Sequence, residues 1–349
     1  MLAKAKSLSR RDFLKVTGSG LAGAAILATT GCGGGSESGG GGEEFTLIAG
    51  HQLAPDTPFD NGLNRFAELV QEKTNGQVTV QVQPAAQAGT EPEMFEAMQQ
   101  GGAVDVAIIA PGSIGEFVPE SNILSMPFLV TSREQRNQII NGAPAETVEQ
   151  LIQDQTTVRT MGYFGGGIRN MFFTEPAESI EDIQGRLFRV QPSDTLTDSF
   201  GAVGLEPSVV SYEELYNALQ QGVVDGAENE SVFIESENFY EAAPHGLLTQ
   251  HEVTIRPLMI GQGTLDRLPE DLGQAVLEAG EEASSYEREI EAEADDEAFQ
   301  RLQEEYGMTF TEPDDIQQAL DAVEPVWQRY AGQWGLEDTL QQMQDMRTE

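Results

Sequence analysis

The stretch GRLFRVQPSDTLTDSFGAVGLEPSVVSYEELYNALQQGVVDGAENE, residues 185–230, contains an alternating pattern of strands and helices. Its opening, GRLFRVQP, predicts a strand, DTLTDSFGAVG a helix and EPSVVS a second strand. SYEELYNALQQG predicts another helix, in which Glu214 follows Ser211 at the spacing of a capping box. VVDGAENES predicts a strand that runs into a turn. This alternation is typical of an α/β domain.

Two arginines stand in the first strand of this stretch. The alternation of side chains along a strand puts Arg186 and Arg189 on opposite faces. A desolvated guanidinium needs an anionic partner, and its planar shape fits a carboxylate with two parallel hydrogen bonds. On the residues alone, two partners for Arg189 remain open: an acidic side chain of the protein itself, or an acid that binds from outside.

A similar block precedes this stretch. EFTLIAGHQ (44–52) predicts a strand, PFDNGLNRFAELVQEKTNG (58–76) a helix with apolar residues every three or four positions, and QVTVQVQP (77–84) an alternating strand. A helix, a strand and two further strands follow before residue 173. From Pro269 a long acidic helix is expected, with its charges on a solvated face, and then a final helix over 313–334. With 349 residues, two α/β domains with a cleft between them are expected.

The charge is strongly negative, with 58 Asp and Glu against 19 Lys and Arg and a formal net charge of −39. This field makes nucleic acid an unsuitable partner. After the first fifteen residues, Lys73 is the only lysine. We interpret this composition as adaptation to strong salt, in which the Debye length near 1 M is only about 3 Å and self-repulsion is screened. The alternative is an acidic protein from ordinary salt.

The first residues have the pattern of an export signal. SLSRRDFLKVTGSGLAGAAILATTGC (7–32) contains a twin arginine, Arg10 and Arg11, followed by a weakly hydrophobic run that is too short for a membrane span. We predict a twin-arginine export and lipoprotein signal over residues 1–31 and a Gly/Ser-rich tether over 32–43. Cys32 is the predicted lipid attachment site; the alternative is an ordinary cleaved signal with an incidental cysteine. A mature chain from Cys32 has 14 basic and 57 acidic side chains, a formal charge of −43.

Motifs of catalysis are absent from the sequence. The single cysteine excludes an intrachain disulfide or a thiol metal cluster, and none of the three histidines stands in a zinc motif. The glycine pattern GSGLAG (18–23) follows no predicted strand and lies inside the export signal, so it does not predict a dinucleotide site. We therefore expect neither an enzyme nor a metal or cofactor protein.

Three segments together resemble one protein family. RFAELVQEKTNGQVTVQVQPAAQAGTEPEMFEAMQQGGAVDVAI (65–108), MPFLVTSREQ (126–135) and the stretch 185–230 are similar to substrate-binding proteins of tripartite ATP-independent periplasmic (TRAP) transporters, dicarboxylate-binding type. The resemblance implies an α/β, two-lobed periplasmic-binding-protein-like (type II) fold, with hinge strands and a long helix spanning both lobes. It places residues 45–166 and 255–294 in lobe I, and 167–254 and 295–349 in lobe II.

The resemblance also implies site residues. It makes Arg189 the clamp for a ligand carboxylate, Arg169 an assisting cation, Asn229 a residue that closes over the ligand and Tyr212 an aromatic wall. Further polar candidates for the other side of the cleft are His51, Gln52 and Glu91.

The function expected from this resemblance is capture of a small organic carboxylate outside the cytoplasm and its delivery to a TRAP membrane permease. The protein is expected to be a monomer held at the membrane by an N-terminal lipid. The alternative is a sensor that presents the ligand to a membrane kinase. A hydrolase or lyase would require an acid/base pair or a nucleophile, which the sequence does not reveal.

Overall fold

The computed structural model describes residues 43–347. The predicted export signal, almost all of the tether and Cys32 lie outside this range. Within it, no helix is both long enough and apolar enough to cross a membrane.

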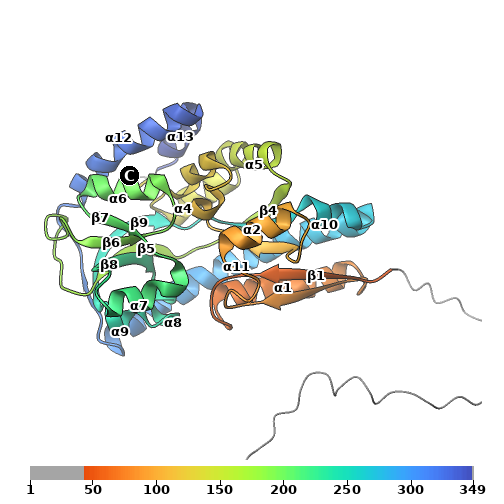
Figure 1. The fold of residues 1–349 in the computed structure, drawn as a ribbon, viewed down its shortest axis with the longest axis horizontal. Coiled ribbons are helices and arrows are strands. Elements are labelled where there is room, and N and C mark those ends of the chain that lie inside the picture. Colours follow the sequence, from red (N-terminus) through yellow and green to blue (C-terminus); the bar gives the residue numbers. More distant parts are fainter. Residues whose placement is uncertain (1–42, 348–349) are drawn as a thin grey trace, which may run out of the picture. The chain divides into compact units, whose positions relative to one another are not determined.

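Two mixed β-sheets organise the described part of the chain (Figure 1). The first sheet has the order β2-β1-β3-β10-β4 and the second has the order β11-β9-β5-β8-β6-β7. The strands of the first sheet are β1 (Phe45–Gly50), β2 (Val78–Gln83), β3 (Val106–Ile108), β4 (Val158–Phe164) and β10 (Arg256–Gly261). Those of the second are β5 (Ile168–Phe173), β6 (Leu187–Val190), β7 (Glu206–Val209), β8 (Gly226–Glu230), β9 (His245–Val253) and β11 (Thr309–Thr311).

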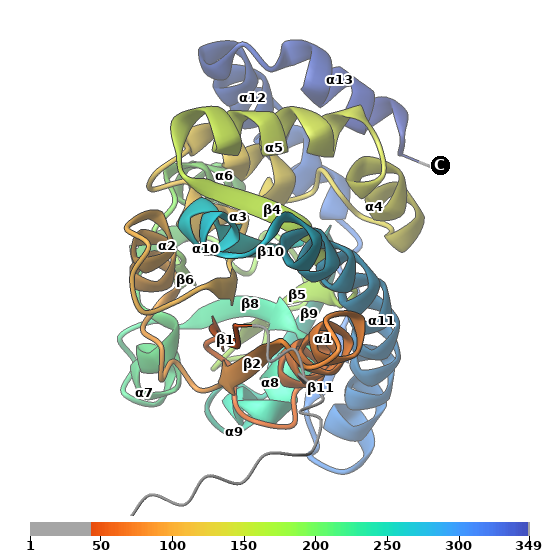
Figure 2. The same ribbon diagram turned by 90° about the vertical axis from the view of Figure 1, so that its right-hand side faces the viewer.

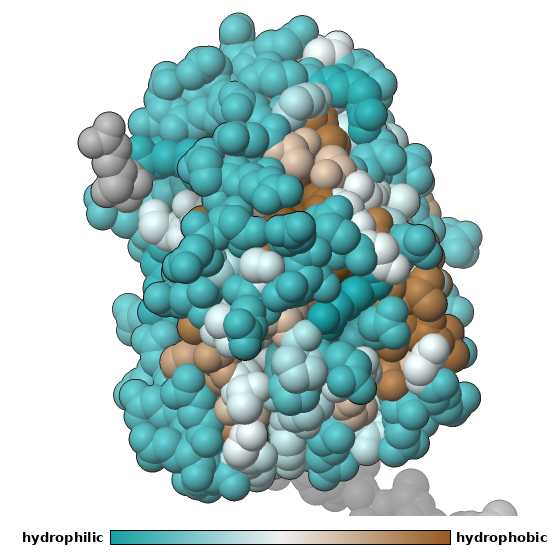
Figure 3. All heavy atoms as spheres, turned by 90° about the vertical axis from the view of Figure 1, so that its left-hand side faces the viewer, coloured by the Kyte–Doolittle hydropathy of each residue, from teal (hydrophilic) through white to brown (hydrophobic). Residues whose placement is uncertain are grey.

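Helices cover both sheets. They are α1 (Pro58–Lys73), α2 (Glu91–Gln99), α3 (Pro111–Ile114), α4 (Arg133–Ile140), α5 (Ala143–Gln155), α6 (Asp194–Val203), α7 (Leu215–Gln220), α8 (Ser231–Ser236), α9 (Phe239–Ala242), α10 (Gln262–Arg267), α11 (Glu270–Glu304), α12 (Ile316–Trp334) and α13 (Glu337–Asp345). Figure 2 shows α13 beside α5, with α11 running past α1. On the face drawn in Figure 3, hydrophilic residues dominate and hydrophobic areas are small.

Helix α1 shows how the apolar spacing sets the local structure. Phe59, Leu63, Phe66 and Val70 all face the core and are almost completely buried. Pro58 occupies the first turn, where its missing N–H costs nothing. The helix ends before Asn75 and Gly76, both of which have positive φ. The amphipathic prediction for this segment is confirmed.

The chain crosses between the two sheets in extended form twice. Residues 165–167 join β4 to β5, and residues 254–255 join β9 to β10. Because of these crossings, β10 is antiparallel to β3 and β4, and β5 is antiparallel to β8 and β9, although β1–β2 and β6–β7 pair in parallel. Helix α11 contacts α1 and β4 on one side and α8 on the other. The predicted two-lobed α/β class with a long spanning helix is confirmed.

The prediction of a wholly solvated acidic face on α11 is wrong at three positions. Glu287, Glu291 and Asp295 are buried one turn apart. They accept hydrogen bonds from the backbone N–H groups of the first crossing and of the residue after it: Gly165 donates to Glu287 at 2.8 Å, Gly166 and Gly167 to Glu291 at 2.8 and 2.9 Å, and Ile168 to Asp295 at 2.9 Å. These carboxylates satisfy backbone donors that no sheet pairs, so α11 holds the crossing in place.

Two details of local structure also differ from the prediction. The helix predicted over 211–222 is a 3-10 turn, Tyr212–Glu214, followed by the short α7. The Ser211 hydroxyl donates to the Glu214 carboxylate at 3.0 Å, so no complete capping box forms. The helices α4, α5 and α13 had no predicted counterpart.

Candidate functional site

A cavity of about 170 Å³ lies where the two sheets, α2 and the turn at Tyr212 meet. Its wall combines residues from the first sheet's side, such as Gln52 and Glu91, with residues of the second sheet. Of the predicted ligand-binding residues, six line it: Gln52, Glu91, Arg169, Arg189, Tyr212 and Asn229. The fold therefore brings together residues that are up to 177 positions apart in the sequence.

Arg189 is the least compensated cation of this cavity. It is 3% exposed, and its Nε donates to the Val210 carbonyl at 2.9 Å. Within residues 43–347 its Nη1 and Nη2 make no hydrogen bond, and no acidic side chain forms an ion pair with it. Burial lowers the pKa of Arg189, although nearby Glu228 opposes this shift. A buried guanidinium without an anion is costly, so an incoming carboxylate would be stabilised here.

Arg186 has a different environment, as the strand alternation predicts. It is half-buried and donates to the backbone carbonyls of Glu175, Pro176 and Asp182 at 2.6 to 3.0 Å. These acceptors are backbone carbonyls, and no acidic side chain within residues 43–347 forms an ion pair with Arg186. Arg186 holds a loop of the second sheet and does not line the cavity.

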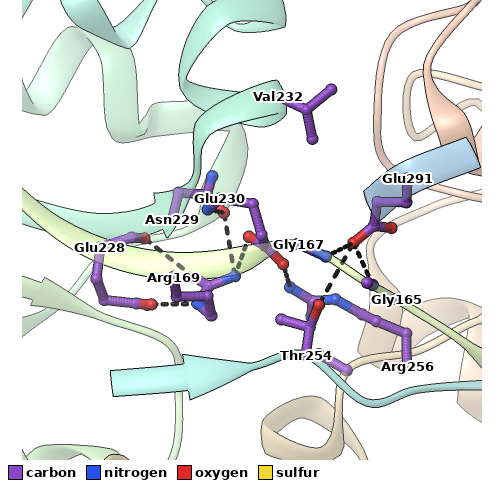
Figure 4. A network of polar contacts seen from close by, with 12 residues as sticks. Gly165, Gly167, Arg169, Glu228, Asn229, Glu230, Val232, Thr254, Arg256 and Glu291 are labelled. Carbon is purple, nitrogen blue, oxygen red and sulfur yellow. Dashed lines mark hydrogen bonds and ion pairs between the residues drawn. The ribbon is translucent and has the colours of Figure 1, made fainter. Parts of the chain in front are cut away.

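Arg169 lies in the cavity wall, and the protein uses four of its five N–H groups. It forms ion pairs with Glu228 and Glu230, and its Nη1 and Nη2 also donate to the Asn229 side chain and the Glu228 carbonyl, both at 3.0 Å (Figure 4). Burial alone would lower the pKa of Arg169, but the two carboxylates hold it well above its usual value. The same charge holds the pKa of Glu228 well below its usual range, against the effect of burial.

Asn229 and Tyr212 form the part of the wall next to Arg189. The Asn229 amide donates to the Tyr212 hydroxyl at 3.1 Å, and the Tyr212 ring centroid lies 5.7 Å from the Arg189 guanidinium carbon. Burial raises the pKa of Tyr212, so its hydroxyl keeps its proton. Asn229 orients Tyr212, and the ring supports the guanidinium from one side.

Glu91 places a carboxylate on the opposite side of the cavity. Its Oε2 accepts hydrogen bonds from the Ser113 hydroxyl at 2.7 Å and from the Ala110 backbone N–H at 3.1 Å. Its Oε1 is buried and has no hydrogen-bond partner within the described residues. This oxygen is therefore an acceptor available for a donor group of a ligand.

His51 is the predicted residue that the cavity does not include. It is fully buried, and its Nε2 lies 3.2 Å from Asp60 Oδ1 at the start of α1. Burial lowers the pKa of His51, which favours a neutral ring bound to Asp60. Its neighbour Gln52 does line the cavity, because successive residues after a strand point to different sides.

Arg256 lines the cavity and was missed by the sequence analysis. It is the first residue of β10, and its Nη2 lies 3.5 Å from Glu230 Oε1. The signal that could have revealed it is a lone arginine in the apolar run TIRPLMI, at the second crossing between the sheets. Within residues 43–347, no group of three or more His, Cys, Asp or Glu side chains is arranged to hold a metal ion.

The chain matches one protein-family model, described as bacterial extracellular solute-binding protein, family 7, over residues 49–333. A solute-binding protein of Sulfitobacter sp. strain NAS-14.1 is 32% identical over 330 residues, covering 95% of this chain and 98% of that protein.

Solved structures with the same fold contain sugar acids. A TRAP periplasmic solute-binding protein of Sulfitobacter sp. NAS-14.1 with bound α-D-taluronate superposes with a TM-score of 0.83 and 33% identity, over 86% of this chain and 97% of that one. A TRAP periplasmic solute-binding protein from Chromohalobacter salexigens with bound D-glucuronate superposes with a TM-score of 0.81 and 28% identity. The match covers 86% of this chain and 100% of that one.

Proposed function

The chain belongs to family 7 of the bacterial extracellular solute-binding proteins, and we propose that it binds a small hydroxylated carboxylate by pairing with Arg189 and delivers it to a TRAP permease. The family consists of binding proteins and not of enzymes, as the sequence analysis expects. The family description also agrees with a location outside the cytoplasm.

The observation that carries this proposal is the state of Arg189. Its two terminal nitrogens are the groups best suited to a carboxylate, and in the described residues they have no protein partner. Each charge-assisted hydrogen bond contributes about 1.5 to 3 kcal/mol, and leaving a buried charge unpaired costs more. A ligand carboxylate would supply the missing anion.

Glu91 supports a ligand with hydroxyl groups in preference to a dicarboxylate. Its unpartnered Oε1 would accept a hydrogen bond from a hydroxyl, whereas a second ligand carboxylate on that side would face a negative charge. Sugar acids such as the uronates bound in the related structures have a carboxylate and several hydroxyls.

The remaining parts of the proposal concern export and assembly. The twin-arginine signal and Cys32 support export of a folded protein and its anchoring by lipid at the membrane surface. We propose a monomer whose two lobes have the boundaries expected from the sequence, with residues 165–167 and 254–255 as hinge segments that allow closure.

A thermal-shift assay in molar salt tests the proposed site. We expect α-D-taluronate, D-galacturonate or D-glucuronate to raise the melting temperature of the wild type, and we expect Arg189→Met to abolish that rise. Arg186→Met is the matched control, because this arginine directly precedes the strand of Arg189 but lies outside the cavity. A rise that persists in Arg189→Met would overturn the assignment of the clamp.

A further inference from the structure

We propose that Arg256 is a further cation, besides Arg189, that contacts the ligand, and that it determines specificity by donating hydrogen bonds to ligand hydroxyl oxygens. This inference rests on the proposed binding of a hydroxylated carboxylate at Arg189. It assigns the selectivity between acids to a residue at the second crossing between the sheets.

The first argument is the number of unused donors. Arg256 is 7% exposed, yet its side chain makes no hydrogen bond to any of the residues 43–347. Its Nε is fully buried without a partner, and its contact with Glu230 Oε1 is a long ion pair of 3.5 Å. The guanidinium carbon lies 5.9 Å from the ring centroid of Phe59, which also lines the cavity. A buried arginine beside a cavity, whose side-chain N–H groups make no hydrogen bond to the described residues and only one long ion pair, is arranged to bind a ligand.

The second argument is the contrast with Arg169. Arg169 donates four hydrogen bonds to Glu228, Asn229 and Glu230, so contact with a ligand through its Nε or Nη1 would require breaking strong ion pairs, and only one N–H of Nη2 is left unused by residues 43–347. Figure 4 shows that Glu230 lies between the two arginines and that Asn229 and Glu228 surround only Arg169. Arg169 therefore positions the wall of the cavity, while Arg256 keeps its donors available.

The third argument separates the roles of Arg256 and Arg189. Glu230 compensates much of the charge of Arg256 without using its hydrogen-bonding capacity, whereas Arg189 has no such acid. Burial lowers the pKa of Arg256, but Glu230 raises it above the usual value, so the side chain stays cationic. A ligand carboxylate is stabilised more by the uncompensated Arg189, and the donors of Arg256 are left for the neutral oxygens of the ligand.

The position of Arg256 also connects such a contact to the hinge. Thr254, two residues earlier in the same crossing, donates to Glu291 of α11 at 3.4 Å, and Glu291 also holds Gly166 and Gly167 of the other crossing (Figure 4). A ligand held by Arg256 is thus held by the backbone segment that joins the sheets.

Calorimetric titration with two ligands tests the inference. The first is whichever of α-D-taluronate, D-galacturonate and D-glucuronate binds the wild type most tightly. The second is tetrahydropyran-2-carboxylate, which keeps the ring and the carboxylate but lacks the hydroxyls. We expect Arg256→Met to weaken uronate binding by about ten- to a hundred-fold, the range of a hydrogen bond from a charged donor, and to weaken the second ligand by less than about three-fold.

Three results would overturn the inference: unchanged uronate affinity in Arg256→Met, an equal loss for both ligands, which is the sign of a structural role, or no uronate binding by the wild type. Arg256→Lys keeps the charge next to Glu230 and should show the same change of selectivity in smaller measure. It is the variant to use if Arg256→Met does not fold. Arg189→Met should lose binding of both ligands. If Arg189→Met still binds them while Arg256→Met loses its selectivity for the uronate, the assignment of Arg189 as the clamp is wrong but the inference on Arg256 stands.

Discussion

Removal of the Glu291 side chain should destabilise the crossing between the sheets. Glu291 is fully buried, and its Oε1 accepts hydrogen bonds from Gly166 at 2.8 Å, Gly167 at 2.9 Å and the Thr254 hydroxyl at 3.4 Å. Glu291→Ala leaves the two backbone N–H groups without an acceptor. Each buried unsatisfied donor costs about 1 to 3 kcal/mol, which gives about 2 to 6 kcal/mol.

A second effect acts in the opposite direction. Burial is the largest cause that raises the pKa of Glu287 well above its usual value, and the charge of Glu291 is the second. Removal of Glu291 relieves this repulsion. We therefore expect the unfolding free energy to decrease by about 2 to 4 kcal/mol, in the lower part of the range given above. Glu291→Gln keeps an acceptor oxygen for the two glycines and loses the charge, and it should cost less than about 1 kcal/mol.

Urea unfolding in molar salt, followed by circular dichroism, measures these differences. Glu289→Ala is the matched control, because Glu289 is an exposed residue of the same helix and should change the unfolding free energy by less than about 0.5 kcal/mol. If Glu291→Ala were no less stable than Glu289→Ala, the claim that α11 holds the crossing through its buried carboxylates would be refuted.

Three further predictions concern pH, ligand selectivity and salt. Burial raises the pKa of Glu252 to about 8, so the folded state binds this proton more tightly than the unfolded chain. The unfolding free energy should therefore decrease as the pH rises from about 4.5 to about 8, by at most about 5 kcal/mol from this group. In thermal melts, the melting temperature of Glu252→Gln should decrease less than that of the wild type over the same pH range. Glu91→Gln should reduce the wild-type preference for a uronate over succinate in calorimetric titrations, because the repulsion of a second carboxylate is removed; an unchanged preference would contradict its role in selectivity. With a formal net charge of −39, the folded fraction measured by circular dichroism should rise with KCl concentration, and full folding in dilute buffer would contradict the interpretation of salt adaptation.

The parts of the fold that depend on local periodicity could be predicted from the sequence. The helix over Pro58–Lys73 and the strand that contains Arg189 follow from apolar spacing and alternation, and both are observed. The direction of Arg189 into a cavity also follows from alternation, since Phe188 and Val190 face the core.

The long-range partners could not be predicted in this way. Nothing near Arg256 in the sequence indicates Glu230 or Phe59, which come from β8 and α1. Charged residues on long helices are usually solvated, so the burial of Glu291 becomes visible only once the glycine-rich crossing lies against α11. Histidine is a residue type that is common in binding sites, but the contact of His51 with Asp60 sets the orientation of its ring.

The central claim is that Arg189 binds the carboxylate of the ligand. A crystal structure of the protein with its most tightly bound uronate tests it most directly. We predict both carboxylate oxygens within hydrogen-bond distance of Arg189 Nη1 and Nη2, with Nε still donating to Val210. A carboxylate bound to Arg169 or Arg256 instead, with the terminal nitrogens of Arg189 facing only water, would contradict the account.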